Sequence, residues 1–358
     1  MRPSTGDDMR RCVRLADAID EIAIACPVCL PSDSPKDDQM LHAICSLMQN
    51  SIKPNEIAPQ SLAEAVIWTE AAAVADQDLP AEKRSSLLVL VSPTSPLRID
   101  PNTCEVILHA AEHNHPMLIG PCPMAGATSP VTMAGTAVQN HAEFLGMLTI
   151  VQLLREGVPV VYGGSAGPMD MRSGTLSYGA TERNTMLCAN IDIANHFGLP
   201  HFSSAGTVDS ASPDIQAGQS KALAWLTRLM KGSTLGIWFG SLLTGTTVAP
   251  EQIVLDADLF RAVKSMLKGM TVDDEHLAYD AIERVGPGGS FLADEHTVSL
   301  MRDEYYYSEV INYDGEGGRS MLDRAHDKVE QILAEYKPTV SEKVRDDLQK
   351  FLNDHAQR

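Results

Sequence analysis

Short apolar runs alternate with amphipathic stretches between residues 10 and 270 of the chain. A polar loop rich in glycine and proline follows most of these runs, and the next stretch shows the apolar spacing of a helix. Strands are predicted at residues 22–25, 52–57, 87–91, 117–119, 158–161, 201–203 and 235–239, of which 52–57 is the weakest. Strands and helices that alternate in this way are typical of parallel sheets with crossover helices.

Local signals mark where some of the helices begin. Ser129 followed by Pro130 predicts an N-cap with proline in the first turn, and Ser61 is predicted to open an alanine-rich helix. The helix after Pro130 has an apolar face at helical spacing. This face comprises Phe144, Met147, Leu148, Val151 and Leu154.

Seven strand–helix units without a dinucleotide-binding fingerprint favour a (β/α)-barrel over an open, doubly wound sheet. A closed barrel has eight units. The predicted fold is therefore α/β, a (β/α)8 TIM-type barrel over residues 1–270 that lacks its first strand unit. After Gly269 the alternation stops, and residues 271–358 are predicted as a C-terminal helical extension with charged surface helices over 324–355.

Composition narrows the functional classes. A net charge of −19 disfavours nucleic acids and anionic membranes, because both would repel the chain, whereas it suits a small cationic substrate. Seven scattered cysteines are typical of a reducing cytoplasm rather than of a disulfide framework. The chain shows no signal segment and no apolar span, so we expect a cytoplasmic protein that binds neither nucleic acid nor membrane.

Reactive groups of (β/α)-barrels lie on the loops that follow the strands. Two of these loops, at residues 163–182 and 203–218, are long and rich in glycine, and loops of this length in a compact domain are usually functional. The side chains that the loops supply as candidates are Cys122, Met124, Thr128, Tyr162, Asp170, Arg172, Tyr178, Glu182, Asp209, Trp238 and Phe239.

Other motifs point less clearly to chemistry. His113 and His115 precede a strand, so they belong on the opposite face of the barrel, and a solvated loop is favoured over a metal site. Cys26 and Cys29 form a lone C-x-x-C without the second pair that a zinc site needs, although a redox or metal role stays open. We therefore expect no metal site.

A specific signature lies at residues 121–132, where the sequence Pro-Cys-Pro-Met-Ala-Gly-Ala-Thr-Ser-Pro-Val-Thr resembles a segment of the trimethylamine methyltransferase family. Further segments resemble the same family in the same order, at residues 160–163, 169–174, 214–218 and 285–292. The resemblance covers nearly the whole chain.

This resemblance implies a (β/α)-barrel that moves a methyl group from a methylated amine to cobalt in a separate corrinoid protein. Founding members carry pyrrolysine, whereas this chain has only standard residues, so it resembles the branch that acts on quaternary amines such as glycine betaine. We expect a corrinoid presented by a cognate partner protein, no tightly bound cofactor, and a homo-oligomer. A non-catalytic or truncated binder of methylated amines stays open as an alternative, as does another barrel enzyme such as a lyase.

The implied chemistry requires a held cation rather than an acid–base pair, and aromatic faces attract quaternary ammonium groups. The aromatic candidates are Tyr162, Tyr178, Trp238 and Phe239. Asp170 or Glu182 could add an opposite charge, and Arg172 could bind the carboxylate of a betaine. The predicted catalytic residues, expected to converge on one barrel mouth with Cys122, Met124 and Phe239, are Tyr162, Asp170, Arg172 and Asp209.

In the family, a strand-bearing segment precedes the part that residues 2–5 resemble. The helix predicted at residues 7–19 would then belong to an absent strand. Its apolar residues Val13, Leu15 and Ile19 would lose part of their cover, and the sheet should stay open or distorted between the first and last predicted strands.

Overall fold

The computed structural model describes residues 1–80, 87–233, 238–313 and 318–356. At its centre lies a four-stranded parallel sheet in the order β1-β2-β3-β5. Its strands are β1 (Asn55–Ile57), β2 (Leu87–Val91), β3 (Met117–Ile119) and β5 (Val160–Tyr162). Single parallel bridges from Ala25 to Asn55 and from Tyr162 to His201 extend the pairing on both sides. Six predicted strand segments therefore lie side by side in chain order.

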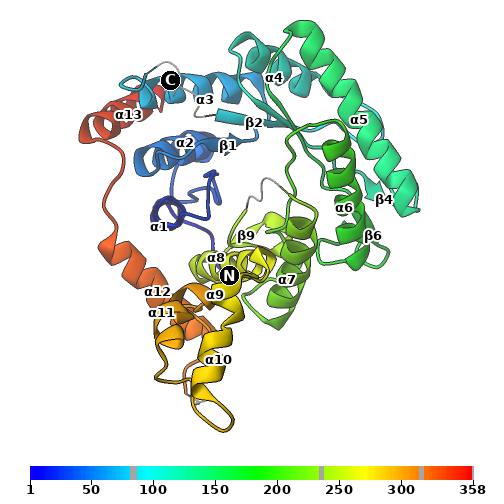
Figure 1. Ribbon diagram of the computed structural model, residues 1–358. Helices are drawn as coiled ribbons and strands as arrows, with labels where there is room; N and C mark the ends of the chain where they lie inside the picture. The colour runs from blue at the N-terminus through cyan, green and yellow to red at the C-terminus, as the bar shows by residue number, and fades with distance from the viewer. Residues whose placement is uncertain (81–86, 234–237, 314–317, 357–358) are drawn as a thin grey trace.

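Eight helices of the described chain surround this sheet. They are α1 (Gly6–Ala18), α2 (Gln39–Asn50), α3 (Leu62–Ala75), α4 (Pro101–Glu112), α5 (Met133–Leu154), α6 (Thr181–His196), α7 (Ile215–Met230) and α8 (Pro250–Lys268). Each helix contacts the next along the chain, and α8 contacts α1, so the helices form a ring (Figure 1).

The predicted α/β fold with parallel strands and crossover helices is confirmed, whereas barrel closure is not seen in the sheet. Across residues 1–80, 87–233, 238–313 and 318–356, no ladder joins the Ala25 end of the sheet to the Phe202 end. The strand predicted at 235–239 falls largely on residues 234–237, which lie outside the described residues. The helices close their ring through side-chain packing, which requires no backbone pairing between strands.

The two faces of the strands pack against different surroundings, as the two-residue period of a strand requires. Val89, Ile119 and Tyr162 belong to a large cluster that includes buried residues of the surrounding helices. Leu88 and Phe202 form a smaller cluster together with Leu118 and the partly buried Trp238. One face of the curved sheet therefore contacts the helix ring, and the other faces the interior that the ring encloses.

Helix α1 is well formed and well covered. Thr5 and Asp8 make reciprocal side-chain bonds to the backbone at its N-terminus, a capping box. Val13, Leu15 and Ile19 are all buried, so the predicted loss of cover is wrong. Leu15 and Ile19 pack in a cluster with residues of α8 and of the C-terminal region, which supply the apolar surface.

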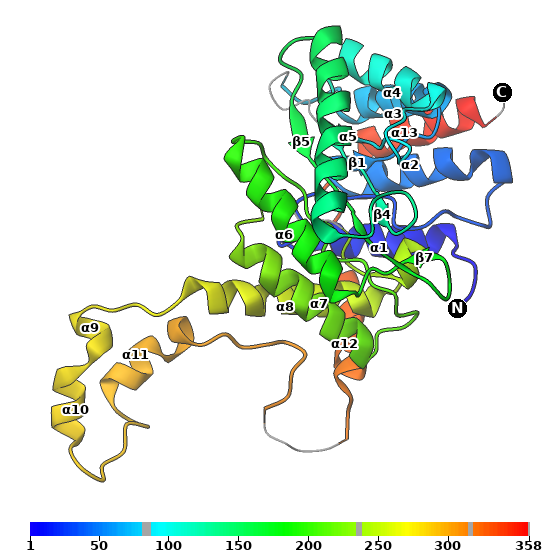
Figure 2. The same ribbon diagram turned by 90° about the vertical axis from the view of Figure 1, so that its right-hand side faces the viewer.

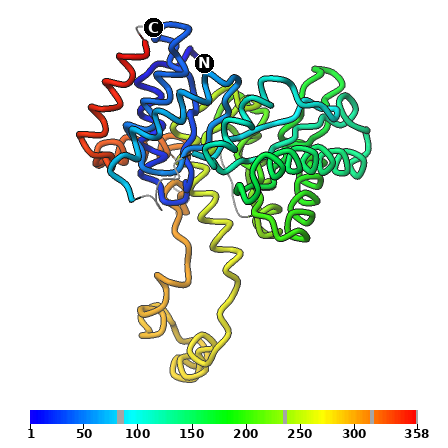
Figure 3. The backbone as a smooth tube through the Cα atoms, turned by 90° about the horizontal axis from the view of Figure 1, so that it is seen from above, coloured from blue at the N-terminus to red at the C-terminus, as the bar shows by residue number. Residues whose placement is uncertain are grey.

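Beyond α8 the chain leaves the body as an arm and then returns (Figures 2 and 3). The arm carries the short helices α9 (Asp274–Leu277), α10 (Tyr279–Val285) and α11 (Glu295–Glu304). The returning helices are α12 (Met321–Glu335), which packs on α1 and α8, and α13 (Glu342–His355), which packs on α2 and α3. The helices predicted over 324–355 are therefore confirmed, and they cover the outside of the ring.

The formation of a homo-oligomer stays a prediction.

Two helix starts test the local signals. Ser61 accepts a hydrogen bond from the backbone N–H of Glu64 and caps α3, as predicted. The predicted cap at Ser129 is wrong, because Thr132 caps α5 through the N–H of Gly135. The Ser129 hydroxyl instead bonds with that of Thr136.

No helix of the described chain, α5 included, is long and apolar enough to cross a membrane.

Candidate active site

The loops at the carboxyl ends of the strands form small sheets of their own. Parts of the loops after β3 and β5 pair as β4 (Met124–Ala125), β6 (Gly167–Asp170) and β7 (Thr175–Leu176). The segment before α8 folds into the hairpin of β8 (Ser241–Leu242) and β9 (Thr247–Val248). Backbone pairing between these loops therefore orders the mouth of the fold, where the strands end.

A cavity of about 320 Å³ opens at this mouth. Its walls come from strand ends and from the loops that follow them, which is where barrel chemistry is expected. The apolar and aromatic residues among its lining include Val28, Leu90, Tyr178, Trp238, Phe239 and Val248. The remaining polar side chains are those of Cys26, Glu56, Thr207, Ser241, Thr244 and Thr247.

Glu56 is the unexpected residue of this cavity. It lies on β1, where its backbone N–H donates to the carbonyl of Ala25 and its side chain is turned to the interior. The residue is 4% exposed, and its Oε2 accepts a hydrogen bond of 3.0 Å from Nε1 of Trp238. Burial raises the pKa of Glu56 to about 7, and the hydrogen bond from Trp238 opposes this rise.

Sequence reasoning missed Glu56 because its strand was the weakest of the predicted set. A usable signal was present, since a lone carboxylate sits between Asn55 and Ile57 within a short strand. A strand residue of this kind must turn either to solvent or to a functional interior. Ile57 packs in the cluster on the helix side of the sheet, so the alternation of a strand turns the Glu56 side chain to the interior.

Trp238, which donates its indole N–H to Glu56, has an unusual backbone conformation. Trp238 adopts φ of 75°, which is uncommon for any residue other than glycine. Two residues later, Gly240 also has a positive φ of 81°, and a Cβ there would meet Ile253 at 2.4 Å. The indole packs edge-on against Phe202, with ring centroids 5.7 Å apart. This costly local conformation is consistent with a functional position for the indole.

Phe239 belongs to the core as well as to the cavity. Its ring lies 5.4 Å from that of Trp225 and 6.2 Å from that of Phe260, in the layer between helices α7 and α8. The residue is buried and also lines the cavity. Phe239 therefore holds the loop in place and adds apolar surface.

Tyr178 forms another wall, and Asp209 holds it there. The two carboxylate oxygens of Asp209 accept hydrogen bonds from the backbone N–H groups of Tyr178 and Gly179, at 2.8 and 2.7 Å. The guanidinium of Arg183 lies over the Tyr178 ring, 4.6 Å from its centroid. Burial raises the pKa of Tyr178, which keeps its hydroxyl protonated. Asp209 thus acts as a loop anchor next to the cavity.

A buried ion pair ties two of the mouth loops together. Nζ of Lys221 on α7 donates to Oδ2 of Asp256 on α8 at 2.7 Å and to the carbonyl of Gly206 at 2.6 Å. The same carboxylate oxygen accepts the backbone N–H of Gly240. Burial raises the pKa of Asp256 and lowers that of Lys221, and their mutual attraction opposes both shifts. The pair thereby fixes the loops that carry Thr207 and Trp238.

Tyr162 occupies a different place from the predicted one. Its ring packs on Phe144 and His141 of α5, with centroid distances of 4.2 and 5.9 Å, and the residue is 1% exposed. These contacts lie between the sheet and the helix ring, so the side chain points away from the interior. Its hydroxyl bonds with Nδ1 of His141 at 3.3 Å.

The charged candidates of the long loop lie at its exposed outer part. Asp170 and Arg172 sit at the turn between β6 and β7, where Oδ1 of Asp170 accepts the backbone N–H of Arg172. Glu182 is exposed in the first turn of α6 and accepts from the Thr181 hydroxyl. None of these three described residues is among those that line the cavity.

The candidates from the loop after β3 form a neighbouring part of the mouth. The Thr128 hydroxyl accepts the backbone N–H of Met124 and shapes the turn. Cys122 Sγ lies 3.5 Å from the carbonyl oxygen of Ser165 in the next loop. Of the predicted site residues, the structure brings Tyr178, Trp238 and Phe239 into the cavity. Asp209 anchors the Tyr178 backbone and Thr128 shapes the turn at Met124, whereas Tyr162, Asp170, Arg172 and Glu182 lie outside the cavity lining.

The C-x-x-C motif reaches the site through one of its cysteines. Cys26 lines the cavity, and Cys29 lies in an adjoining hollow of about 860 Å³ that shares Val28 and Thr247 with it. Burial raises the pKa of both thiols, so they are protonated near neutral pH. Both are free cysteines. A search of the described residues for groups of three or more potential metal ligands finds none.

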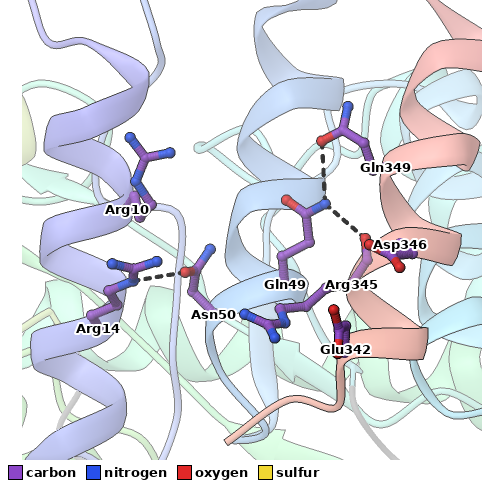
Figure 4. A pocket seen from close by; sticks show the side chains of 8 residues that line it. All are labelled: Arg10, Arg14, Gln49, Asn50, Glu342, Arg345, Asp346 and Gln349. Atoms are coloured by element: carbon purple, nitrogen blue, oxygen red, sulfur yellow. Dashed lines mark hydrogen bonds between the residues drawn. The ribbon is translucent and has the colours of Figure 1, made fainter. Parts of the chain in front are cut away.

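A separate hollow of about 370 Å³ lies among helices α1, α2 and α13 (Figure 4). Its lining includes Arg10, Arg14 and Arg345, with Arg14 donating to Asn50 across the gap between α1 and α2. Gln49 donates to the carbonyl of Arg345 and so joins α2 to α13. This hollow belongs to the helix ring and its outer cover, away from the strand ends.

The mouth cavity thus combines a buried carboxylate with an indole, a phenol and neutral hydroxyls. Such a site attracts a small cation through charge and aromatic faces.

Comparison with known proteins defines the chain further. A sequence model of the family described as "Trimethylamine methyltransferase (MTTB)" matches residues 1–358. The chain belongs to this family.

Members of the family align over much of the chain. A trimethylamine methyltransferase MttB of Desulfitobacterium hafniense (strain DSM 10664 / DCB-2) is 31% identical over 344 residues, which are 94% of this chain and 69% of that protein. A glycine betaine methyltransferase of D. hafniense (strain Y51) is 31% identical over 319 residues, 86% of this chain and 66% of that protein.

A Methanosarcina relative matches over a shorter part of its length. The trimethylamine methyltransferase MttB of Methanosarcina barkeri (strain Fusaro / DSM 804) is 33% identical over 266 residues, 72% of this chain. The match spans about half of that relative, at 53% of its length. Among solved structures, the monomethylamine methyltransferase MtmB of M. barkeri aligns at 13% identity with a TM-score of 0.45, over 98% of this chain and 70% of that one.

Proposed function

We propose that the chain transfers a methyl group from a methylated amine to the Co(I) of a corrinoid that a separate partner protein carries. One observation supports this most: the Glu56 carboxylate and the Trp238 indole line the same cavity at the strand ends. A negative group beside an aromatic face is the chemistry that holds an ammonium cation. Family membership supports methyl transfer as the reaction class.

The proposed reaction is a displacement at the methyl carbon. The electron pair of Co(I), the methyl acceptor and therefore a substrate, forms the new bond to carbon while the C–N bond breaks. The electron pair of the broken bond stays on nitrogen, so a quaternary ammonium ion leaves as a neutral tertiary amine. No proton is transferred, and the site needs no general acid.

The residues of the cavity then serve to bind and orient. Glu56 draws the ammonium group to the interior end of the cavity, and the hydrogen bond from Trp238 fixes the carboxylate. Orientation of this kind raises the rate of methyl transfer, because binding has already fixed the position of the reacting groups. The Lys221–Asp256 pair holds the loops that carry Trp238 and Thr207.

The adjoining hollow supports the approach of a large acceptor. With a volume of about 860 Å³, it shares Pro27, Ala58 and Gly245 with the cation cavity. Gly245 is exposed at the common rim. A methyl group held beside this rim can face a group that a partner protein brings from outside.

A direct assay tests the proposal. The purified chain is mixed with cob(I)alamin and a panel of methylated amines, and methylcobalamin formation is followed by absorbance. We expect a quaternary amine to react and Glu56→Gln to lower kcat/KM by at least about tenfold, because the carboxylate that attracts the cation is lost. Failure of the whole panel, repeated with a corrinoid protein as acceptor, would refute methyl transfer.

The matched control is Glu105→Gln, the same chemical change on the exposed surface of α4. It should leave kcat/KM unchanged within about twofold, as surface substitutions usually do. Equal losses in both variants would show that the effect of Glu56 is general and not tied to the cavity.

A further inference from the structure

We infer that the mouth cavity selects quaternary ammonium ions that carry no carboxylate, such as choline or tetramethylammonium, over betaines. The inference rests on the proposed function for its reaction and adds the class of substrate. It comes from the distribution of charge around the cavity, which places one carboxylate and no basic side chain among the described lining residues.

Few of the described residues that line the cavity are charged. Glu56 is the charged member of the lining, and the rest are apolar, aromatic, thiol or hydroxyl side chains. The adjacent residues 234–237 read Thr-Leu-Gly-Ile and therefore bring no charge. A cation entering this cavity meets an opposite charge, whereas an anion meets a like charge.

A betaine would bring its own carboxylate into this space. Burying a carboxylate is costly unless a cation or several donors pair with it. A bidentate arginine is the usual solution for a carboxylate ligand. Arg172, the residue predicted for this role, lies exposed at the turn between β6 and β7 and outside the lining.

Arg183 comes near the cavity, but it is already engaged. Its guanidinium lies behind the ring of Tyr178, and the residue is 1% exposed. Its terminal nitrogens donate to the carbonyl and hydroxyl of Ser204 and to the hydroxyl of Ser165. Reaching a carboxylate in the cavity would require Tyr178 to move and these hydrogen bonds to break.

Two hydroxyls of the cavity lining suit a neutral polar tail. The hydroxyls of Thr207 and Ser241 lie 3.2 Å apart and both line the cavity. Such hydroxyls can donate to or accept from an alcohol without a charge. An ammonium head at Glu56 and a short hydroxyl tail at this pair would each meet a lining group of matching chemistry.

Binding is measured without any corrinoid, so the test does not depend on catalysis. The probes are choline, tetramethylammonium, glycine betaine and the uncharged carbon analogue of choline, in which a quaternary carbon replaces nitrogen. Trp238 lines the cavity, so its fluorescence reports occupancy, whereas Trp225 lies outside the lining and Trp68 lines the adjoining hollow. Calorimetry on the same samples gives an independent Kd.

We expect choline and tetramethylammonium to bind at least about tenfold more tightly than both glycine betaine and the carbon analogue, since each of the weaker ligands lacks a net positive charge. In Glu56→Gln, whose amide oxygen still accepts from Trp238, choline should bind no better than its carbon analogue. Glu105→Gln should retain the preference of the unaltered chain. Glycine betaine binding as tightly as choline to the unaltered chain would overturn the inference.

A second variant identifies the alternative. If Arg183 did bind a betaine carboxylate, Arg183→Lys would weaken glycine betaine and leave tetramethylammonium unchanged, because the planar fork is lost. Under the inference, neither ligand loses affinity selectively. Absent methyl transfer together with the expected binding order would refute the proposed function alone, while methyl transfer with glycine betaine preferred in binding would refute the inference alone.

Discussion

Lys221 and Asp256 form an ion pair that is fully buried, with 2.7 Å between Nζ and Oδ2. The pair lies beneath the loops of the mouth, since Lys221 also donates to the carbonyl of Gly206 and Asp256 accepts from Gly240. Neither side chain reaches the cavity. The ion pair instead holds the loops that contain Gly206 and Gly240 next to each other.

Asp256→Asn should lower the free energy of unfolding by about 3–5 kcal/mol, because it leaves the Lys221 charge buried without its partner. The double variant Lys221→Met with Asp256→Leu should lose less, since it buries no charge. Urea denaturation followed by circular dichroism measures both. The exposed pair Lys231–Asp192 is the control, where Asp192→Asn should cost no more than about 1 kcal/mol. Similar losses at the two sites would contradict the role given to the buried pair.

Glu56 should make stability depend on pH. Its folded pKa of about 7 lies above the usual 4.5, so the folded state binds a proton that the unfolded state releases between these values. Stability therefore falls as pH rises from about 4.5 to 7, by about 3 kcal/mol for this group. Cys26, the neighbouring titratable group, keeps its proton over this range because burial raises its pKa.

Glu56→Gln removes this pH dependence. The variant should gain stability relative to the unaltered chain at pH 8 and little at pH 5, because the charged form alone carries the burial penalty. Urea midpoints at both pH values test the prediction. The same difference between the two proteins at pH 5 and pH 8 would show that Glu56 does not titrate in this range.

Trp238→Phe should raise the pKa of Glu56 further, because the indole N–H that favours the charged carboxylate is lost. Choline affinity measured by calorimetry across pH 6 to 9 should then reach its plateau at a higher pH than in the unaltered chain. Trp225→Phe, a change of the same kind outside the cavity, should leave the pH midpoint in place. An unshifted midpoint in Trp238→Phe would contradict the coupling of the two residues.

Tyr162 should behave as a core residue. Tyr162→Ala should lower the free energy of unfolding by about 3–5 kcal/mol, because it leaves a void against Phe144 and the helix ring. Tyr162→Phe keeps the ring and loses one hydrogen bond to His141, at about 1 kcal/mol. Denaturant titration distinguishes the two. Full stability in the alanine variant together with lost activity would instead favour a role for Tyr162 in catalysis.

Local periodicity was enough to locate most of the sheet. The apolar runs at 87–91 and 117–119 match β2 and β3 residue for residue, because a buried parallel strand is apolar on both faces. Helix starts depend on hydrogen bonds that several nearby side chains can make. Ser129 and Thr132 both have side chains that can cap a helix, and in the structure Thr132 caps α5 while the Ser129 N–H bonds to the Met124 carbonyl in the preceding turn.

The sequence predicted which loops carry site residues, but it did not predict to which face of the sheet each side chain points. Trp238 and Tyr178 were predicted from apolar runs and the loops that follow them, and both line the cavity. Tyr162 also stands at a strand end, but the two-residue period turns it to the helix side. A shift of one position reverses the face of every side chain on a strand, and the ends of short strands are not defined by composition alone.

The sequence by itself determined the parallel strand–helix alternation, the family and the end of the fold at which polar groups gather. Only the tertiary structure decided that Glu56 and Trp238, which are 182 residues apart, share one hydrogen bond. It also placed the Lys221–Asp256 pair beneath the loops and left Arg172 outside the cavity. The physical reason is that periodicity reports burial along one element, whereas a pairing between distant elements depends on how the sheet curves and how the helices pack around it.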